Sequence, residues 1–140
     1  PVLVLPLHAA IGVDDDVELV ELLRAYLASD GFRVSVAHDG ASGVRAALVE
    51  LPDIAVIDVM MPGYSGIEVL RRIRADERTA LLPVVVLTTS KEHQDIFEAY
   101  RLGANSYIRK PVDFERFLQA VGQLGLYWLS LNEPSDLTAR

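Results

Sequence analysis

The chain has 140 residues, of which 51% are hydrophobic and 24% charged, a length and composition that suit one globular domain with a substantial core. The formal net charge of −7 argues against a nucleic-acid partner, since non-specific binding to phosphates needs basic surface. The absence of cysteine excludes disulfide and thiolate chemistry and suits a cytoplasmic location.

Apolar runs of strand length alternate with amphipathic stretches of helix length, which is the pattern of βαβ units in a parallel sheet. The runs lack clean alternation, so both faces of the sheet should be covered by helices. The expected strands are Ala9–Val13, Arg33–Ala37, Ile54–Asp58, Val84–Thr88 and Ser106–Arg109. The expected helices are Val17–Ala28, Ala41–Leu51, Gly66–Arg74, Gln94–Leu102 and Phe114–Leu131, with Gly103 as a C′ residue.

The domain boundaries follow from these elements. Residues 9–131 form the expected domain and residues 132–140 a C-terminal tail. Residues 1–8 are read as a loose leader, because chain termini are often poorly ordered. The alternative is an extra edge strand or an exchanged segment, because Val2–Leu5 has better strand propensity than Ala9–Val13. The opening residues are too short to span a bilayer and lack the basic region of a signal peptide, so no membrane partner is expected.

Four polar features follow apolar runs at the predicted ends of strands. They are the run Asp14-Asp15-Asp16, Asp58 before Val-Met-Met-Pro-Gly, Thr88, and Lys110 before Pro111. Ligands of open α/β sheets bind at the carboxyl ends of the strands, so these side chains should meet at one edge. Each feature alone has an ordinary structural explanation, such as a helix N-cap at Asp16 or a solvated loop residue. Their combination favours a functional site.

The chemistry of this combination indicates phosphoryl transfer. Unpaired carboxylates as close as Asp14, Asp15 and Asp58 repel one another, and a hard cation such as Mg²⁺ removes that repulsion. Lys110 would add a fixed positive charge and Thr88 a hydroxyl donor. A free oxygen of the Asp58 carboxylate could then attack in line and form an aspartyl phosphate.

With these segments the chain resembles the receiver domain of two-component response regulators over about Ala9 to Leu131. The segments are Val13-Asp14-Asp15-Asp16, Pro52 to Gly63, Leu87-Thr88-Thr89-Ser90 and Gly103 to Pro111. The resemblance implies a flavodoxin-like, doubly wound (βα)5 fold with strand order 2-1-3-4-5. It also implies a regulatory rather than enzymatic domain, phosphorylated by a histidine kinase.

The resemblance assigns roles to individual residues. It implies that Asp58 is the phosphoacceptor and that Asp14, Asp15, Asp58 and the backbone carbonyl of Met60 bind Mg²⁺. Thr88 and Lys110 hold the phosphoryl oxygens, and the Lys110–Pro111 bond is expected to be cis. Tyr107 matches the aromatic residue that turns inward when the Thr88 side chain moves. The face that changes is formed by the fourth helix, fifth strand and fifth helix.

The C-terminal half is similar to small stand-alone regulators that partner phytochrome-type and other hybrid histidine kinases. In those proteins an aromatic-Trp-Leu extension of the last helix builds a homodimer. Here the corresponding residues are Tyr127, Trp128 and Leu129. The alternative is that they complete the core of their own domain. We expect a homodimer, because aromatic anchors are favoured at interfaces.

Two other functions compete with the switch. An aspartyl-nucleophile phosphatase would need a second acid two residues after Asp58, where this chain has Met60. A receiver-like binding module would keep the fold without accepting phosphate, which the full set of site residues argues against. Phosphorylation by acetyl phosphate in the presence of Mg²⁺ separates the three hypotheses.

Overall fold

The computed structural model describes residues 8–61, 63–89 and 93–132, apart from the side chains of residues 93–95 and 125–132. Five parallel strands form one sheet in the order β2-β1-β3-β4-β5, with β1 at its interior beside β3. The predicted doubly wound fold is therefore confirmed. Among the described residues, no helix is both long and apolar enough to cross a membrane.

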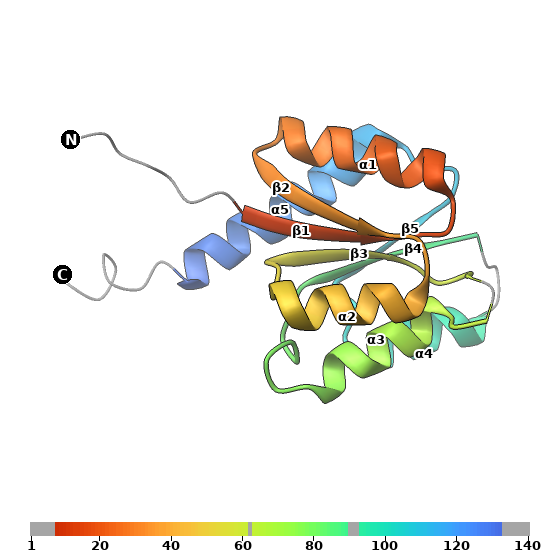
Figure 1. Ribbon diagram of the computed structural model, residues 1–140. Coiled ribbons are helices and arrows are strands. Elements are labelled where there is room, and N and C mark those ends of the chain that lie inside the picture. Colours follow the sequence, from red (N-terminus) through yellow and green to blue (C-terminus); the bar gives the residue numbers. More distant parts are fainter. Residues whose placement is uncertain (1–7, 62, 90–92, 133–140) are drawn as a thin grey trace, which may run out of the picture.

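The elements follow the predicted ranges closely. The strands are β1 (His8–Val13), β2 (Phe32–Ala37), β3 (Ile54–Asp58), β4 (Val84–Thr88) and β5 (Ser106–Arg109). The helices are α1 (Val17–Ser29), α2 (Gly40–Glu50), α3 (Gly66–Ala75), α4 (His93–Arg101) and α5 (Phe114–Asn132). Figure 1 shows the carboxyl ends of the strands converging at one edge, while α5 extends beyond the opposite edge.

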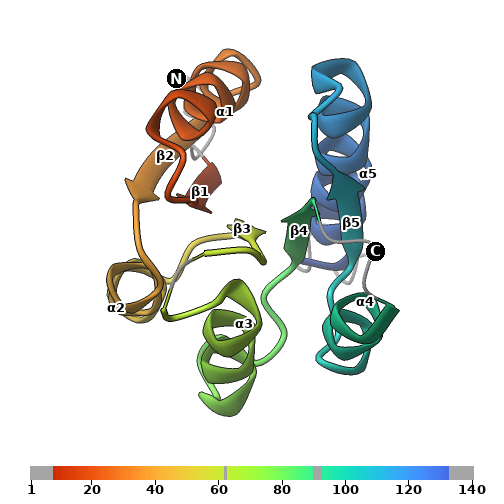
Figure 2. The same ribbon diagram turned by 90° about the vertical axis from the view of Figure 1, so that its right-hand side faces the viewer.

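Two layers of helices cover the two faces of the sheet, with α1 and α5 on one face and α2, α3 and α4 on the other (Figure 2). Strand β3 shows how the sheet serves both layers. Its Ala55 and Ile57 belong to the core under α2 and α3, while Ile54 and Val56 belong to the core under α1 and α5. All five residues of β3 are buried, which accounts for the unbroken apolar run in the sequence.

Local sequence signals set several helix ends. The Asp16 side chain accepts a hydrogen bond from Leu19 N at 3.1 Å, so the expected N-cap of α1 is confirmed. At the end of α4, Gly103 has a φ of 77° and its N donates to Tyr100 O at 2.9 Å. Ala104 N donates to Ala99 O at the same distance, which completes a Schellman motif at the predicted glycine.

Two predictions concern parts of the chain outside the described residues. Residues 1–7 of the expected leader are not described, whereas His8 is the first residue of β1. The backbone of α5 continues to Asn132, but the side chains of Tyr127, Trp128 and Leu129 are not described. The leader and the dimer surface therefore stay predictions.

Candidate phosphoryl-transfer site

The Asp58 side chain is fixed at the end of the fully buried strand β3. It is 1% exposed, and its Oδ1 accepts a hydrogen bond from Met60 N at 3.1 Å. The following loop turns back tightly, because Gly66 N donates to Val59 O at 3.1 Å. A Cβ at Gly66 would collide with the Asp58 carbonyl, so this close approach requires glycine.

The second carboxylate belongs to Asp14, the residue directly after the neighbouring strand β1. Asp14 is 1% exposed, its N donates to Ala37 O at 3.1 Å, and its Oδ1 accepts from Asp16 N at 2.9 Å. Asp15 is exposed beside it. One carboxylate oxygen from each of Asp14, Asp15 and Asp58 can be chosen so that all three lie within 4.8 Å of one another. The structure thus brings together the three acids selected from the sequence.

Lys110 enters this cluster from the end of β5. Its Nζ lies 3.0 Å from Asp14 Oδ2 and 3.3 Å from Asp58 Oδ2, so one ammonium contacts both buried carboxylates. The Lys110–Pro111 bond is cis, as predicted, and Lys110 N donates to Thr88 O at 2.8 Å. Burial opposes the charged ammonium, but the Asp14 hydrogen bond and both carboxylate charges prevail and raise the pKa of Lys110.

The buried cluster of carboxylates makes the ionisation of Asp58 unfavourable. Burial raises the pKa of Asp58 to about 7, and the nearby Asp14 charge adds to the effect. Lys110 and the Met60 N–H act in the opposite direction without cancelling it. A carboxylate so unfavourably placed is characteristic of a functional site and calls for more positive charge than Lys110 supplies.

The donor chemistry fits a hard divalent cation. Asp14, Asp15 and Asp58 present only oxygen atoms. Among the described residues, their combined charge exceeds that of the Lys110 ammonium, which contacts Asp14 and Asp58. Magnesium favours one or two carboxylates together with water and phosphate oxygens, rather than a closed protein cage. The exposure of Asp15 leaves the cluster accessible to water on one side.

Thr88 and Tyr107 lie beside a small cavity under α4. Thr88 is 3% exposed at the end of β4, and Tyr107 is half-buried on β5. Both line this void of about 10 Å³ together with Val59, Val86, Ile96 and Ala99. The Tyr107 ring meets the exposed Tyr100 ring edge-on, with centroids 5.1 Å apart. The structure therefore brings the two predicted switch residues to one cavity.

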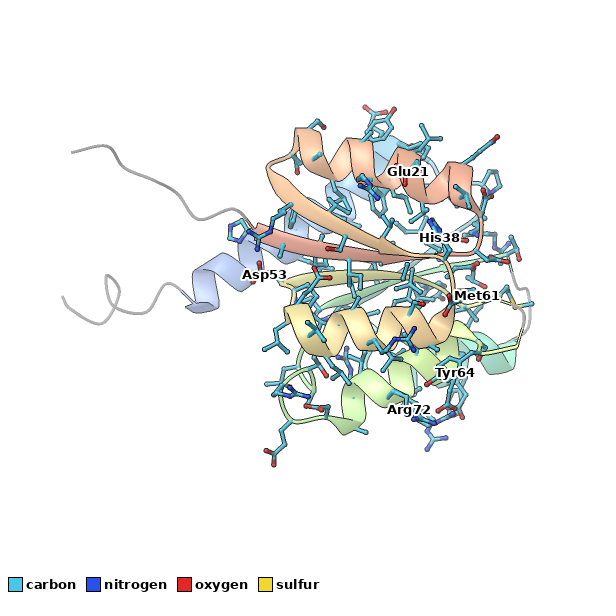
Figure 3. All side chains as sticks on the ribbon, in the orientation of Figure 1. Glu21, His38, Asp53, Met61, Tyr64 and Arg72 are labelled. Atoms are coloured by element: carbon cyan, nitrogen blue, oxygen red, sulfur yellow. The ribbon has the colours of Figure 1, made fainter. Side chains whose placement is uncertain are left out.

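Sequence reasoning missed His38 at the rim of the site. His38 Nδ1 lies 3.4 Å from the backbone oxygen of Asp14, and the side chain is exposed. Figure 3 shows His38 and Met61 at the carboxyl edge of the sheet, with Asp53 at the opposite edge. His38 directly follows β2, so the rule of polar residues at strand ends could have identified it.

Comparison with known proteins agrees with this geometry. Residues 10–122 match the family model described as the response regulator receiver domain. The chain therefore belongs to the family of receiver domains of two-component response regulators, which are regulatory domains. The predicted family is confirmed.

Individual relatives differ in how much of their length this chain covers. The DNA-binding dual master transcriptional regulator RpaA of Synechocystis sp. is 38% identical over 112 residues, which are 80% of this chain and 46% of RpaA. Protein PilH of Pseudomonas aeruginosa is 36% identical over 109 residues, 78% of this chain and 90% of PilH. The crystal structure of a putative response regulator from Chloroflexus aurantiacus has a TM-score of 0.78 and 28% identity, covering 85% of this chain and 98% of that one.

Proposed function

We propose that this chain is a phosphorylation-activated signalling switch that accepts a phosphoryl group from a histidine kinase on Asp58. The observation that carries the proposal is the buried Asp58 carboxylate within 3.3 Å of Lys110 Nζ, beside two further aspartates. This arrangement combines a nucleophilic oxygen, a fixed cation and a set of oxygen ligands for Mg²⁺. Family membership supports the same function.

In the proposed reaction an Asp58 carboxylate oxygen forms a bond to phosphorus while the phosphorus–nitrogen bond of the donor phosphohistidine breaks. Lys110 would bind a phosphoryl oxygen, and the Met60 N–H fixes the orientation of the carboxylate. Asp14, Asp15, Asp58 and the Met60 carbonyl would hold Mg²⁺, which supplies charge stabilisation for the transferring group when bound.

The proposed response runs through Thr88 and Tyr107. The Thr88 hydroxyl would gain a hydrogen bond to the phosphoryl group and so favour one of two conformations. Tyr107 borders the same small void as Thr88 and would turn inward. The surface formed by α4, β5 and α5 would then change, and this surface would carry the signal to a cytoplasmic target.

The partners are proposed at two levels. A histidine kinase is the expected phosphodonor, and the resemblance of the C-terminal half favours a phytochrome-type or hybrid kinase.

A homodimer through Tyr127, Trp128 and Leu129 would bury the aromatic extension of α5. Sedimentation at micromolar concentration should show a dimer for the parent and a monomer for Trp128→Ala. A monomeric parent, whether phosphorylated or not, would contradict the dimer.

Acetyl phosphate labelling tests the phosphoacceptor. The parent incubated with acetyl phosphate and Mg²⁺ should gain one phosphoryl group by intact mass spectrometry. Asp58→Asn should lose at least a hundredfold in labelling, whereas Asp30→Asn, an exposed aspartate outside the site, should label like the parent. Thr88→Ala should keep the label but lose most of the spectral change that follows phosphorylation.

Each alternative function has its own outcome in this experiment. Full labelling of Asp58→Asn would show that another residue is the acceptor. An unlabelled parent that still binds Mg²⁺ would favour the phosphate-independent binding module. Rapid turnover of a phosphomonoester, with release of inorganic phosphate, would favour the phosphatase.

A further inference from the structure

Two described parts of helix α4 have different surroundings. Toward its middle, Ile96 and Ala99 border a void of about 10 Å³ that Thr88 and Tyr107 also line. A void of this size holds no more than about one water molecule. This part of α4 therefore lies beside the two residues of the proposed switch.

The end of α4 is held by Arg74, from the last turn of α3. Arg74 Nε donates to Leu102 O at 2.7 Å and Nη2 to Gly103 O at 2.9 Å. Nη1 donates to Leu82 O at 2.7 Å, and a longer contact of 3.4 Å reaches Thr79 O. One guanidinium thus joins the end of α3, the connection into β4 and the turn after α4.

The chemistry of this contact suits a permanent anchor. Burial lowers the pKa of Arg74, but a guanidinium stays charged in proteins. Its positive charge lies at the C-terminus of α4, where the helix dipole and the unpaired carbonyls favour a cation. A Cβ at Gly103 would lie 3.3 Å from Arg74 Nε, so the glycine also keeps space for the guanidinium.

The turn after α4 is fixed by further bonds that do not involve Arg74. Asn105 N donates to Val84 O at 2.9 Å, and Asn105 Oδ1 accepts from Val84 N at 2.8 Å. Along the helix itself the tie to α3 is weaker, because Arg71 Nη2 lies 3.9 Å from Glu98 Oε2 in a partly exposed pair. Among the described residues, the hydrogen bonds that hold α4 to the rest of the domain are therefore concentrated at its C-terminal end.

We propose that Arg74 is a positioning residue that makes the C-terminal end of α4 a pivot, so that switching moves the helix start and leaves the turn in place. This inference rests on the proposed function, because phosphorylation is the event that would drive the motion. The inference predicts that residues 93–99 move on phosphorylation and that residues 101–105 stay in place.

Hydrogen exchange by mass spectrometry, with and without acetyl phosphate and Mg²⁺, tests the pivot. In the parent, phosphorylation should change exchange at least fivefold in peptides from the start of α4 and less than twofold in residues 101–105. Arg74→Lys keeps the charge but loses the planar set of donors. It should raise exchange in residues 101–105 about tenfold before phosphorylation and spread the response along the whole helix.

The matched control is Arg72→Lys. In the parent, the Arg72 guanidinium bonds to Glu68 on the same helix α3 and not to the turn after α4, so this variant should give the exchange pattern of the parent. Intact mass of the same samples distinguishes the two ways of failing. A labelled parent whose exchange changes equally at both ends of α4 would overturn the pivot alone, even if Arg74→Lys failed to fold. A parent that takes up no phosphoryl group would overturn the proposed function and the pivot with it.

Discussion

Charged side chains have different surroundings at the two edges of the sheet. At the carboxyl edge, Asp14 and Asp58 are each 1% exposed and share the Lys110 ammonium, so negative charge exceeds positive charge among the described residues of the site. At the amino edge, the Arg74 guanidinium donates to several carbonyls and Asp53 Oδ2 accepts from Ala9 N at 2.7 Å. The same sheet thus carries a strained ionic cluster at one end and well-satisfied polar contacts at the other.

This contrast indicates how stability is distributed in the molecule. Polar groups that are buried and bonded contribute to folding, whereas a buried carboxylate without full compensation costs stability until a ligand arrives. The amino edge should therefore stabilise the fold, and the carboxyl edge should destabilise it in the absence of metal. Substitutions at the two edges should change the free energy of unfolding with opposite signs.

The largest expected effect is at Arg74. Arg74→Met keeps much of the side-chain volume but leaves the carbonyls of Leu102, Gly103 and Leu82 without this donor, so the free energy of unfolding should fall by about 3 kcal/mol. Urea denaturation followed by circular dichroism measures the change. Arg72→Met, which loses only a surface ion pair with Glu68, should lower the free energy of unfolding far less than Arg74→Met. Equal losses in the two variants would contradict the special role of the amino edge.

A gain of stability is expected at Asp58. Its pKa in the folded protein, about 7, exceeds the ordinary 3.8, so the folded state holds the extra proton and the parent loses stability as pH rises from about 4 to about 7. The pKa difference limits the effect to about 4 kcal/mol. Without divalent cation, Asp58→Asn should be more stable than the parent by about 2 kcal/mol at pH 8, and this advantage should disappear near pH 4.

Asp76 should give the opposite pH dependence of the free energy of unfolding, measured by the same urea denaturation. Hydrogen bonds from the Arg78 side chain and backbone lower the pKa of this partly exposed carboxyl to about 2. The contribution of Asp76 to the free energy of unfolding is present above pH 4 and is lost as pH falls through 2. Asp76→Asn should therefore show no gain at pH 8. If Asp76→Asn gained as much stability at pH 8 as Asp58→Asn, general charge reduction, and not burial, would explain both gains.

The smallest effect is expected at Asp53, which fixes the start of β1. Asp53→Ala removes the acceptor of the Ala9 N–H and should lower the free energy of unfolding by about 1 kcal/mol. Asp53→Asn keeps an acceptor oxygen and should lose less than half of that amount. Thermal unfolding of both variants at pH 7 provides the comparison. An Asn variant as unstable as the Ala variant would point instead to the contact between Asp53 Oδ2 and His8 Nδ1, which lie 3.8 Å apart.

The sequence predicted the sheet and the meeting of the acids for a common physical reason. Strands such as Ile54–Asp58 are buried on both faces, so they appear as unbroken apolar runs, and the polar residue after each run marks the carboxyl edge. The C-cap at Gly103 was also predictable, because a left-handed residue at this position favours glycine. These features depend on local pattern and on one topological rule.

Contacts between distant parts of the chain were not predictable in this way. Arg74 was part of an expected amphipathic helix, and nothing in the pattern shows that its guanidinium reaches carbonyls up to 29 residues away. The distances from Lys110 to two carboxylates likewise depend on the packing of β5 against β4 and on the cis bond before Pro111. Such contacts arise only once the whole sheet is assembled.

The close approach at Gly66 has a consequence for how this chain tolerates variation. Any side chain there would displace the Asp58 carbonyl, although Gly66 is at the start of a helix, where many residue types are normally accepted. In a saturation library selected only for folded protein, position 66 should therefore be as restricted as the centre of β3. A selection blind to signalling would still retain the backbone geometry of the acceptor, because the same glycine serves the fold and the site.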